Sequence, residues 1–122
     1  MEFKSRTVFV DRLELEFDVL ADDAIIGPAI EKGSWADDET FLFLKHVSPG
    51  DHVIDLGANV GWFAVNAVLA VATVHAFEPV PGIADVCQRN MERAMEIGRG
   101  TGVVHRVAAG AARGSAEIAI GG

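Results

Sequence analysis

The chain has 122 residues, of which 50% are hydrophobic, so its apolar side chains suffice to fill the core of one small domain. Eighteen acidic against ten basic residues give a formal net charge of -8, which disfavours a surface that follows the phosphate backbone of nucleic acids. The single cysteine, Cys87, excludes a disulfide within the chain, and residues 1–6 lead into no apolar signal-peptide core, so we expect a cytoplasmic protein.

The N-terminal part, residues 1–48, predicts a β-hairpin and a helical lead-in. The expected strands are Thr7–Val10 and Leu13–Phe17, because the second segment alternates apolar and charged residues, as a strand with one face in water does. A short helix follows over Ala24–Glu31, with Asp22 or Asp23 as its cap.

A second helix is predicted to begin at Asp37-Asp38-Glu39. Carboxylates in the first turn suit the positive end of the helix dipole and accept hydrogen bonds from free N–H groups. Ser48-Pro49-Gly50-Asp51 then ends this helix and begins the second part of the chain.

Residues 49–122 alternate between strands and helices. The expected elements are the strand His52–Leu56, the helix Trp62–Val71, the strand Thr73–Phe77, the helix Ile83–Ile97 and the strand Val103–Ala108. Gly98–Gly102 predicts a flexible turn, and Ala116–Ile120 predicts a last short strand. This order predicts parallel strands with right-handed crossovers, which is half of a doubly wound α/β fold.

Such a half sheet has a strand edge that needs a partner. The strand His52–Leu56 stays unpaired on one side unless the N-terminal hairpin, a second copy of the chain or another protein covers it. Residues 56–77 contain no Asp, Glu, Lys or Arg, so a membrane span is an alternative interpretation of this stretch. The polar residues within it and the absence of flanking basic residues favour a loop, a buried helix and a buried strand instead.

The most informative segment runs from Val53 to Trp62, with Val74–Pro79 after it. It predicts a strand, a glycine turn, a helix and a second strand that ends in Glu78, 23 residues after Asp55. In a βαβ unit an acid at that distance is placed to bind ribose hydroxyls, and a glycine turn lets a ligand approach the start of a helix. We interpret the segment as a site for a nucleoside cofactor.

The turn differs from the dinucleotide fingerprint. That pattern requires glycine where this chain has Asn59 and Trp62, which disfavours close approach of a pyrophosphate. The helix start suits a carboxylate such as that of the methionyl end of S-adenosylmethionine, and Asp55 can receive the ammonium group. Glu78 can accept hydrogen bonds from ribose hydroxyls, and Pro79 can form an apolar wall for the adenine.

Three segments resemble the S-adenosylmethionine-binding half of FkbM-type methyltransferases: Val53–Gly61, His75–Pro79 and Val107–Gly110. The lead-in from Gly33 to Asp51 is also similar to that family. The resemblance implies the first half, β-α-β-α-β, of a Rossmann-like methyltransferase three-layer fold. It also implies methyl transfer from S-adenosylmethionine to a hydroxyl of a small molecule or glycan.

The resemblance also implies which residues hold the cofactor. By this resemblance, the residues of the glycine turn would surround the methionyl part of the cofactor. Glu78 would hold the ribose, and the backbone of Ala108 would approach the adenine. The implied cofactor-binding residues are Asp55, Gly57, Ala58, Asn59, Gly61, Glu78, Pro79 and Ala108. The family continues with a segment like K-I-D-x-E-G, which this chain lacks, so the sequence assigns no catalytic residue.

Two other functions remain open at this level. Glu78 permits a nicotinamide-dependent oxidoreductase, although the missing middle glycine opposes it, and the short chain permits a non-catalytic remnant or interaction module. The four histidines are scattered without the spacing of metal ligands, so we expect no metal. We expect Glu78→Ala to weaken cofactor binding with little loss of fold.

Overall fold

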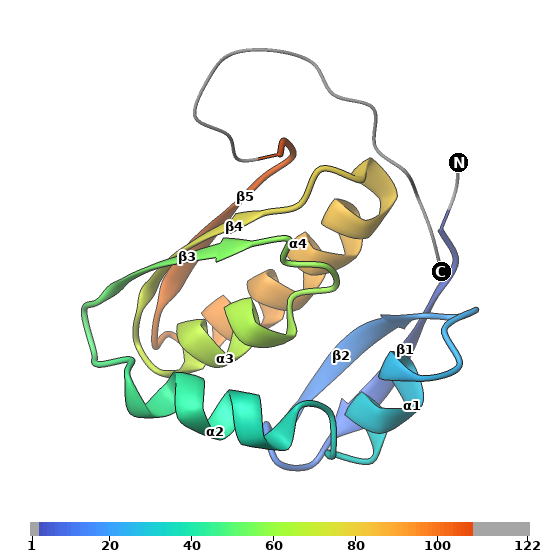
Figure 1. The fold of residues 1–122 in the computed structure, drawn as a ribbon, viewed down its shortest axis with the longest axis horizontal. Coiled ribbons are helices and arrows are strands. Elements are labelled where there is room, and N and C mark those ends of the chain that lie inside the picture. Colours follow the sequence, from blue (N-terminus) through green and yellow to red (C-terminus); the bar gives the residue numbers. More distant parts are fainter. Residues whose placement is uncertain (1–2, 109–122) are drawn as a thin grey trace.

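The structure is a computed structural model, and it describes residues 3–108. In chain order (Figure 1) its elements are β1 (Ser5–Val10), β2 (Leu15–Leu20), α1 (Ile26–Glu31), α2 (Asp37–Lys45), β3 (His52–Leu56), α3 (Trp62–Leu69), β4 (Thr73–Phe77), α4 (Pro81–Glu96) and β5 (Thr101–His105). The strand expected at Ala116–Ile120 lies outside the described residues. No helix among residues 3–108 is long and apolar enough to cross a membrane.

The predicted hairpin is present, with longer strands than expected. β1 and β2 pair antiparallel from Ser5 opposite Leu20 to Val10 opposite Leu15, so β2 starts two residues later than predicted and extends three residues further. The turn is longer because the N–H groups of Leu13 and Glu14 both donate to the carbonyl of Val10. The strand continues through Asp18 because this carboxylate has partners on another element.

The two short helices follow the prediction with small shifts. The Asp23 carboxylate accepts hydrogen bonds from the N–H groups of Ile25 and Ile26, so an aspartate caps the beginning of this helix, as expected. Helix α1 begins at Ile26 rather than at Ala24. Helix α2 begins at Asp37, and all three residues of its first turn are acidic. These side chains lie where the helix dipole favours negative charge.

A three-stranded parallel sheet in the order β3-β4-β5 forms the centre of the second part. Helices α3 and α4 make the crossovers, and Leu56, Phe77 and His105 stand in register at the carboxyl ends of the strands. The predicted fold class, a partial Rossmann-like fold, is confirmed.

The third strand differs from its predicted bounds. β5 begins at Thr101 rather than Val103, and it ends at His105, three residues before Ala108. Gly102 belongs to the strand and not to a flexible turn, because it pairs with Val74 and packs against Met91. A Cβ at position 102 would displace the terminal methyl group of Met91, so α4 lies close to the sheet at this glycine.

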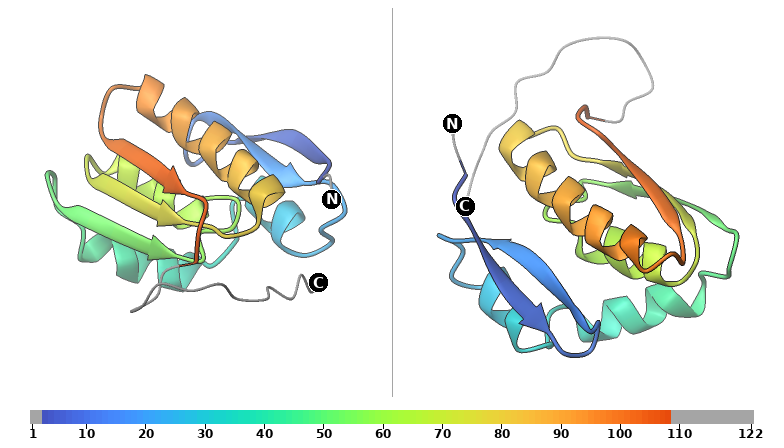
Figure 2. Two further views of the ribbon diagram at one scale, coloured as in Figure 1. Left: turned by 90° about the horizontal axis from the view of Figure 1, so that it is seen from above. Right: turned by 180° about the vertical axis from the view of Figure 1, so that it is seen from behind.

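Helix α4 lies between the parallel sheet and the hairpin, since it contacts both β5 and β2. The strands, the helices and the hairpin therefore form three successive layers (Figures 1 and 2). The hairpin forms a separate two-stranded sheet and leaves the outer edge of β3 unpaired among the described residues.

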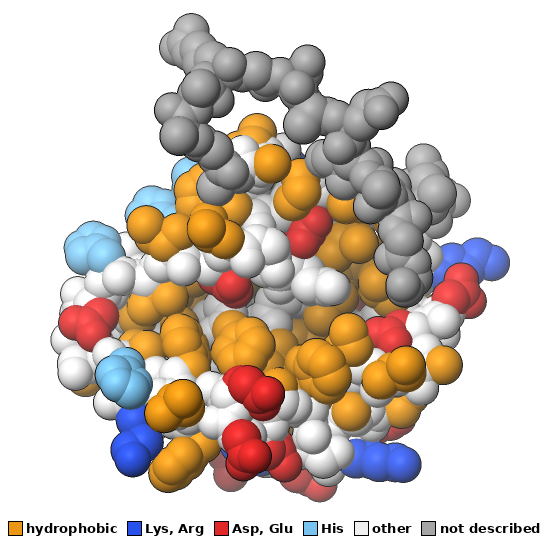
Figure 3. Space-filling model, viewed as in Figure 1, with side chains coloured by type: hydrophobic (Ala, Val, Ile, Leu, Met, Phe, Trp, Pro, Cys, Tyr) orange, Lys and Arg blue, Asp and Glu red, His pale blue; other side chains and the backbone are white. Residues whose placement is uncertain are grey.

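One face of the parallel sheet carries no helix within residues 3–108. Alternate residues of each strand point to this face, and Ile54 and Leu56 are 67% and 64% exposed there. His75 and His105 stack on the same face, and pale blue histidine side chains lie at the margin of Figure 3 where the strands run. Parallel sheets are usually covered on both faces, whereas the exposed Ile54 and Leu56 leave apolar surface on this one.

Asp18 anchors the hairpin to α4. Its side chain is almost fully buried, at 4% exposed, and accepts hydrogen bonds from Thr7, Arg89 and Arg93 at 2.7 to 2.9 Å. Burial by itself would raise the pKa of Asp18, but these hydrogen bonds and the nearby arginine charge hold the pKa below its usual value. The ionised form is therefore the native one.

Candidate functional site

The turn between β3 and α3, residues 57–61, is held against the end of β4. The N–H groups of Gly57 and Ala58 both donate to the carbonyl of Phe77, over 2.9 and 3.0 Å. Gly57, Asn59 and Gly61 adopt left-handed backbone angles, with φ of 69°, 55° and 95°. Glycine and asparagine are the residues that tolerate this conformation, so the sequence pattern has a direct backbone cause.

Glu78 directly contacts this turn. Its side chain is 6% exposed; Oε1 accepts the N–H of Asn59 over 2.8 Å, and Oε2 accepts the N–H of Val80 over 3.1 Å. The acid and the turn, separated in sequence, therefore form one site. Our expectation that Glu78→Ala leaves the fold nearly unchanged needs correction, because alanine would remove the acceptor of two backbone N–H groups.

Asp55 belongs to β3, and its side chain lies near Glu78 and the first turn of α3. A hydrogen bond from the backbone of Ala64 lowers its pKa, but burial and the neighbouring Glu78 charge raise it more, to about 6. Its Oδ2 atom is buried and has no hydrogen-bond partner among the described residues. A buried carboxylate oxygen without a donor is costly, so the site suits a ligand that brings a cationic donor.

The beginning of α3 adds a second polar feature. Gly61 precedes the helix and supplies no side-chain cap, so the first N–H groups of α3 are not capped by the preceding side chain. The helix itself is almost wholly apolar, and Trp62 is fixed by a hydrogen bond from Nε1 to Oγ1 of Thr40 over 2.9 Å. A rigid, buried helix thus directs its positive end at the turn.

The other predicted site residues lie around this centre. Pro79 is half-buried and follows Glu78, and Phe77 stacks on His105 with ring centroids 4.5 Å apart. Ala108 is exposed and lies three residues beyond β5. The structure brings together Asp55, the turn and Glu78.

Two residues of α4 that the motif does not contain also contact the turn. Nδ2 of Asn90 donates to the carbonyl of Val60 over 2.8 Å, and Cys87 packs against Gly61. Burial raises the pKa of the Cys87 thiol to about 12, and the charges of Asp55 and Glu78 add to this, so the thiol is inert. The only sequence signal for Asn90 is its place on the apolar stripe of a predicted helix.

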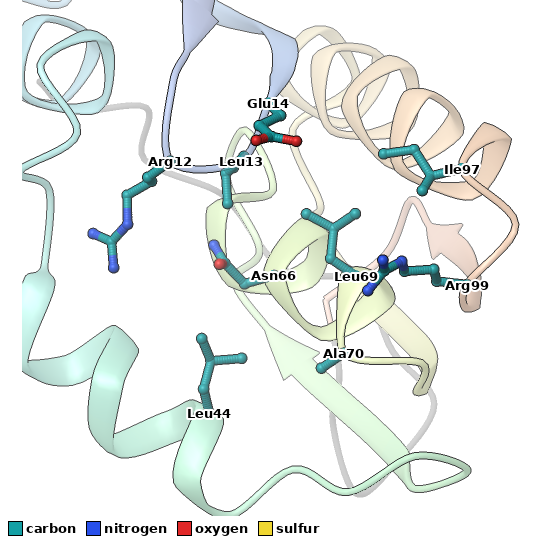
Figure 4. A pocket seen from close by; sticks show the side chains of 9 residues that line it. All are labelled: Arg12, Leu13, Glu14, Leu44, Asn66, Leu69, Ala70, Ile97 and Arg99. Atoms are coloured by element: carbon teal, nitrogen blue, oxygen red, sulfur yellow. The ribbon is translucent and has the colours of Figure 1, made fainter.

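Two cavities lie away from this turn. One of about 390 Å³ lies between the hairpin turn and the C-terminal ends of α3 and α4, and Figure 4 shows Asn66, Leu69 and Arg99 among its lining residues. Another, of about 560 Å³, lies between α2 and the start of β3. No group of three or more metal-ligating side chains occurs within residues 3–108.

A parallel βαβαβ sheet with a glycine turn and a contacting acid at its carboxyl edge is one half of a Rossmann-like fold. No protein-family model and no curated protein matches the sequence. Several solved structures share the fold. A Pyrococcus horikoshii protein that carries a provisional transferase name has a TM-score of 0.58 and 19% identity, over 82% of this chain and 36% of its own.

Two further similar structures hold bound ligands. TYW2 of P. horikoshii, in complex with MeSAdo, has a TM-score of 0.54 and 21% identity over 75% of this chain and 33% of its own. The tRNA (uracil-54, C5)-methyltransferase of Pyrococcus abyssi, in complex with S-adenosyl-L-homocysteine, has a TM-score of 0.54 and 16% identity over 86% of this chain and 24% of its own. The chain thus spans about a third or less of these proteins, and the likeness shows its fold.

Proposed function

We propose that this chain binds S-adenosylmethionine at the turn of residues 57–61 and serves as the cofactor-binding part of an FkbM-type methyltransferase. The observation that carries the proposal is the contact of Glu78 with the turn, beside the unpartnered Oδ2 of Asp55. The fold that the chain shares with a methyltransferase in complex with S-adenosyl-L-homocysteine supports it as an analogy.

The residues of the site match the parts of this cofactor. The ammonium group would satisfy Oδ2 of Asp55, and the methionyl carboxylate would meet the N–H groups at the start of α3. Each oxygen of Glu78 accepts one backbone N–H and has a further lone pair for a ribose hydroxyl. Gly57, Ala58, Asn59 and Gly61 would line the methionyl part, and Pro79 and Ala108 would flank the adenine.

S-Adenosylmethionine supplies an activated methyl group when bound. The chain's own contribution, in this proposal, is to orient the cofactor and to exclude water around Asp55. We propose a hydroxyl of a small molecule or glycan as the acceptor, because the net charge of -8 disfavours nucleic acid. We also propose the cytoplasm as its location, since Cys87 is a free thiol.

A nicotinamide cofactor is the second candidate, and Glu78 is the observation that favours it. An NAD pyrophosphate needs close backbone approach, which the side chain of Asn59 opposes. Isothermal titration of the protein with S-adenosylhomocysteine and with NAD separates the two proposals. Binding of NAD alone would contradict the methyltransferase proposal.

Glu78→Gln is expected to weaken S-adenosylhomocysteine binding about tenfold or more, because charge-assisted hydrogen bonds to the ribose contribute about 1.5–3 kcal/mol. Glutamine retains one acceptor for the backbone, so it perturbs the fold less than alanine. The matched control is Glu92→Gln, an exposed carboxylate on α4 whose side chain contacts Gln88. Titration at a temperature where circular dichroism shows both variants folded checks the result, and equal affinity would remove Glu78 from the ribose.

The edge of β3 that no strand pairs within residues 3–108 supports one further proposal, pairing with a second copy of the chain. Light scattering at increasing protein concentration should then show a dimer, and amides of β3 should become protected from hydrogen exchange. A monomer at all concentrations would contradict this proposal.

A methyl-transfer assay on hydroxylated small molecules distinguishes an enzyme from a non-catalytic remnant.

A further inference from the structure

Asn90 occupies a central position between the hairpin and the candidate cofactor turn. The residue lies in α4 and is fully buried, at 0% exposed. Its Nδ2 atom donates to the carbonyl of Val60 over 2.8 Å and to the carbonyl of Asp18 over 2.9 Å. Its Oδ1 atom accepts the N–H of Asp18 over 2.7 Å. Both amide hydrogens and the carbonyl oxygen are thereby used.

These contacts admit only one orientation of the amide. If oxygen and nitrogen were exchanged, the oxygen would face two carbonyl oxygens, and the NH₂ group would face the N–H of Asp18. The side chain is therefore a fixed bridge between two backbone segments that are 42 residues apart in the sequence, at Asp18 and Val60. Deleting the bridge would leave buried carbonyl groups without donors.

The carbonyl of Val60 controls the geometry of the turn. A peptide unit is planar, so the direction of this C=O fixes the direction of the N–H of Gly61. That N–H donates to the carbonyl of Ala58 over 2.9 Å and closes the turn just before α3. The preceding residue, Asn59, is the one whose N–H binds Glu78. Asn90 thus holds the peptide that links the Glu78 contact to the start of α3.

A second contact joins the same two regions. Phe17, the neighbour of Asp18 in β2, packs edge-on against Trp62, the first residue of α3, with ring centroids 5.9 Å apart and an interplanar angle of 73°. Two adjacent hairpin residues therefore support two positions at the end of the turn. The N-terminal hairpin therefore packs against the region of the turn of residues 57–61 and α3.

We propose that Asn90 is a positioning residue, through which the N-terminal hairpin holds the turn of residues 57–61 in the conformation that receives the cofactor. The inference rests on the proposed function for its cofactor. Its structural part, the coupling of the hairpin to the turn, can be measured without any ligand.

The test uses Asn90→Ser, whose side chain is too short to bridge Val60 and Asp18. Hydrogen exchange of the ligand-free protein should show the amides of Asn59 and Gly61 exchanging about tenfold faster, while β4 amides keep their protection relative to global unfolding. The dissociation constant for S-adenosylhomocysteine should rise about tenfold. If Asn90→Ser does not fold, Asn90→Leu serves, because it keeps the side-chain volume on α4 and loses the bridge without burying a charge.

The matched control is Val68→Ala. It removes buried apolar contacts near the C-terminal end of α3 and so destabilises the protein, but it keeps the hairpin residues, Asn90 and the residues of the turn. The turn amides, relative to global unfolding, and the affinity should then stay near the values of the unmodified protein. Unchanged turn amides in the folded Asn90 variant, or an equal effect of Val68→Ala, would overturn the proposal. Absence of S-adenosylhomocysteine binding to the unmodified protein would refute the proposed function, while the exchange data would still decide the coupling.

Discussion

Gly61→Ala is expected to lower the free energy of unfolding by about 2–4 kcal/mol and to abolish measurable binding of S-adenosylhomocysteine. Two costs add at this position. Its φ of 95° lies in the region that residues with a Cβ rarely adopt, at about 1–3 kcal/mol. A Cβ would also lie 3.0 Å from Sγ of Cys87, in a tightly packed part of the core, at a similar cost. Relief of either strain requires movement of the turn and therefore of the site.

Gly50→Ala is the matched control for this experiment. Gly50 has a similar φ of 87°, but a Cβ there meets nothing within 4 Å, and it lies at the other end of β3. It should show the backbone cost alone, about 1–2 kcal/mol, and unchanged affinity. In a Cys87→Ala background the cost of Gly61→Ala should shrink, because the crowded sulfur is gone. Urea unfolding of the unmodified protein, the three single variants and the double variant measures these costs, and equal costs for the two glycines would contradict the crowding at Gly61.

The cofactor turn could be predicted from the sequence because its causes are local. Glycine at positions 57 and 61 and asparagine at 59 permit left-handed backbone angles, and all three residues adopt them. The acid at the end of β4 was placed near the turn by the length of one βαβ crossover, and Glu78 does contact it. The glycine turn and the acid could be predicted because they depend on a few neighbouring residues and on the regular geometry of one βαβ unit.

The contacts that complete the site could not be predicted in this way, since their causes are distant in sequence. Asp18 looks like one more surface acid of an alternating strand, yet its partners Arg89 and Arg93 lie more than 70 residues later. Asn90 looks like a polar break in an apolar stripe. Its value as a bridge depends on where Val60 lies after folding, which local periodicity does not specify.

Asp55→Asn is expected to stabilise the folded protein by about 1–2 kcal/mol above pH 7. The folded-state pKa of Asp55, about 6, lies above its ordinary value of 3.8, so the folded state favours the neutral acid. This preference contributes stability fully below pH 4, and the contribution is lost as the pH rises through about 6. A difference of this size corresponds to about 3 kcal/mol for a fully buried group, and solvent screening around the partly exposed Asp55 lowers it to about 1–2 kcal/mol. Asparagine removes both the burial penalty on the charge and the repulsion from Glu78.

The same substitution should nevertheless weaken S-adenosylhomocysteine binding by more than tenfold, because the proposed ammonium contact needs the carboxylate. Binding to the unmodified protein should therefore weaken as the pH falls below about 6, and the variant should lose this dependence. Asp51→Asn, at the opposite end of β3, removes one carboxylate without either effect and is the control. Thermal unfolding and titration calorimetry from pH 5 to 8 give both quantities. If Asp55→Asn gains stability and keeps its affinity, the Asp55 carboxylate does not bind the ligand. If Asp55→Asn loses stability above pH 7, the raised pKa of Asp55 is contradicted.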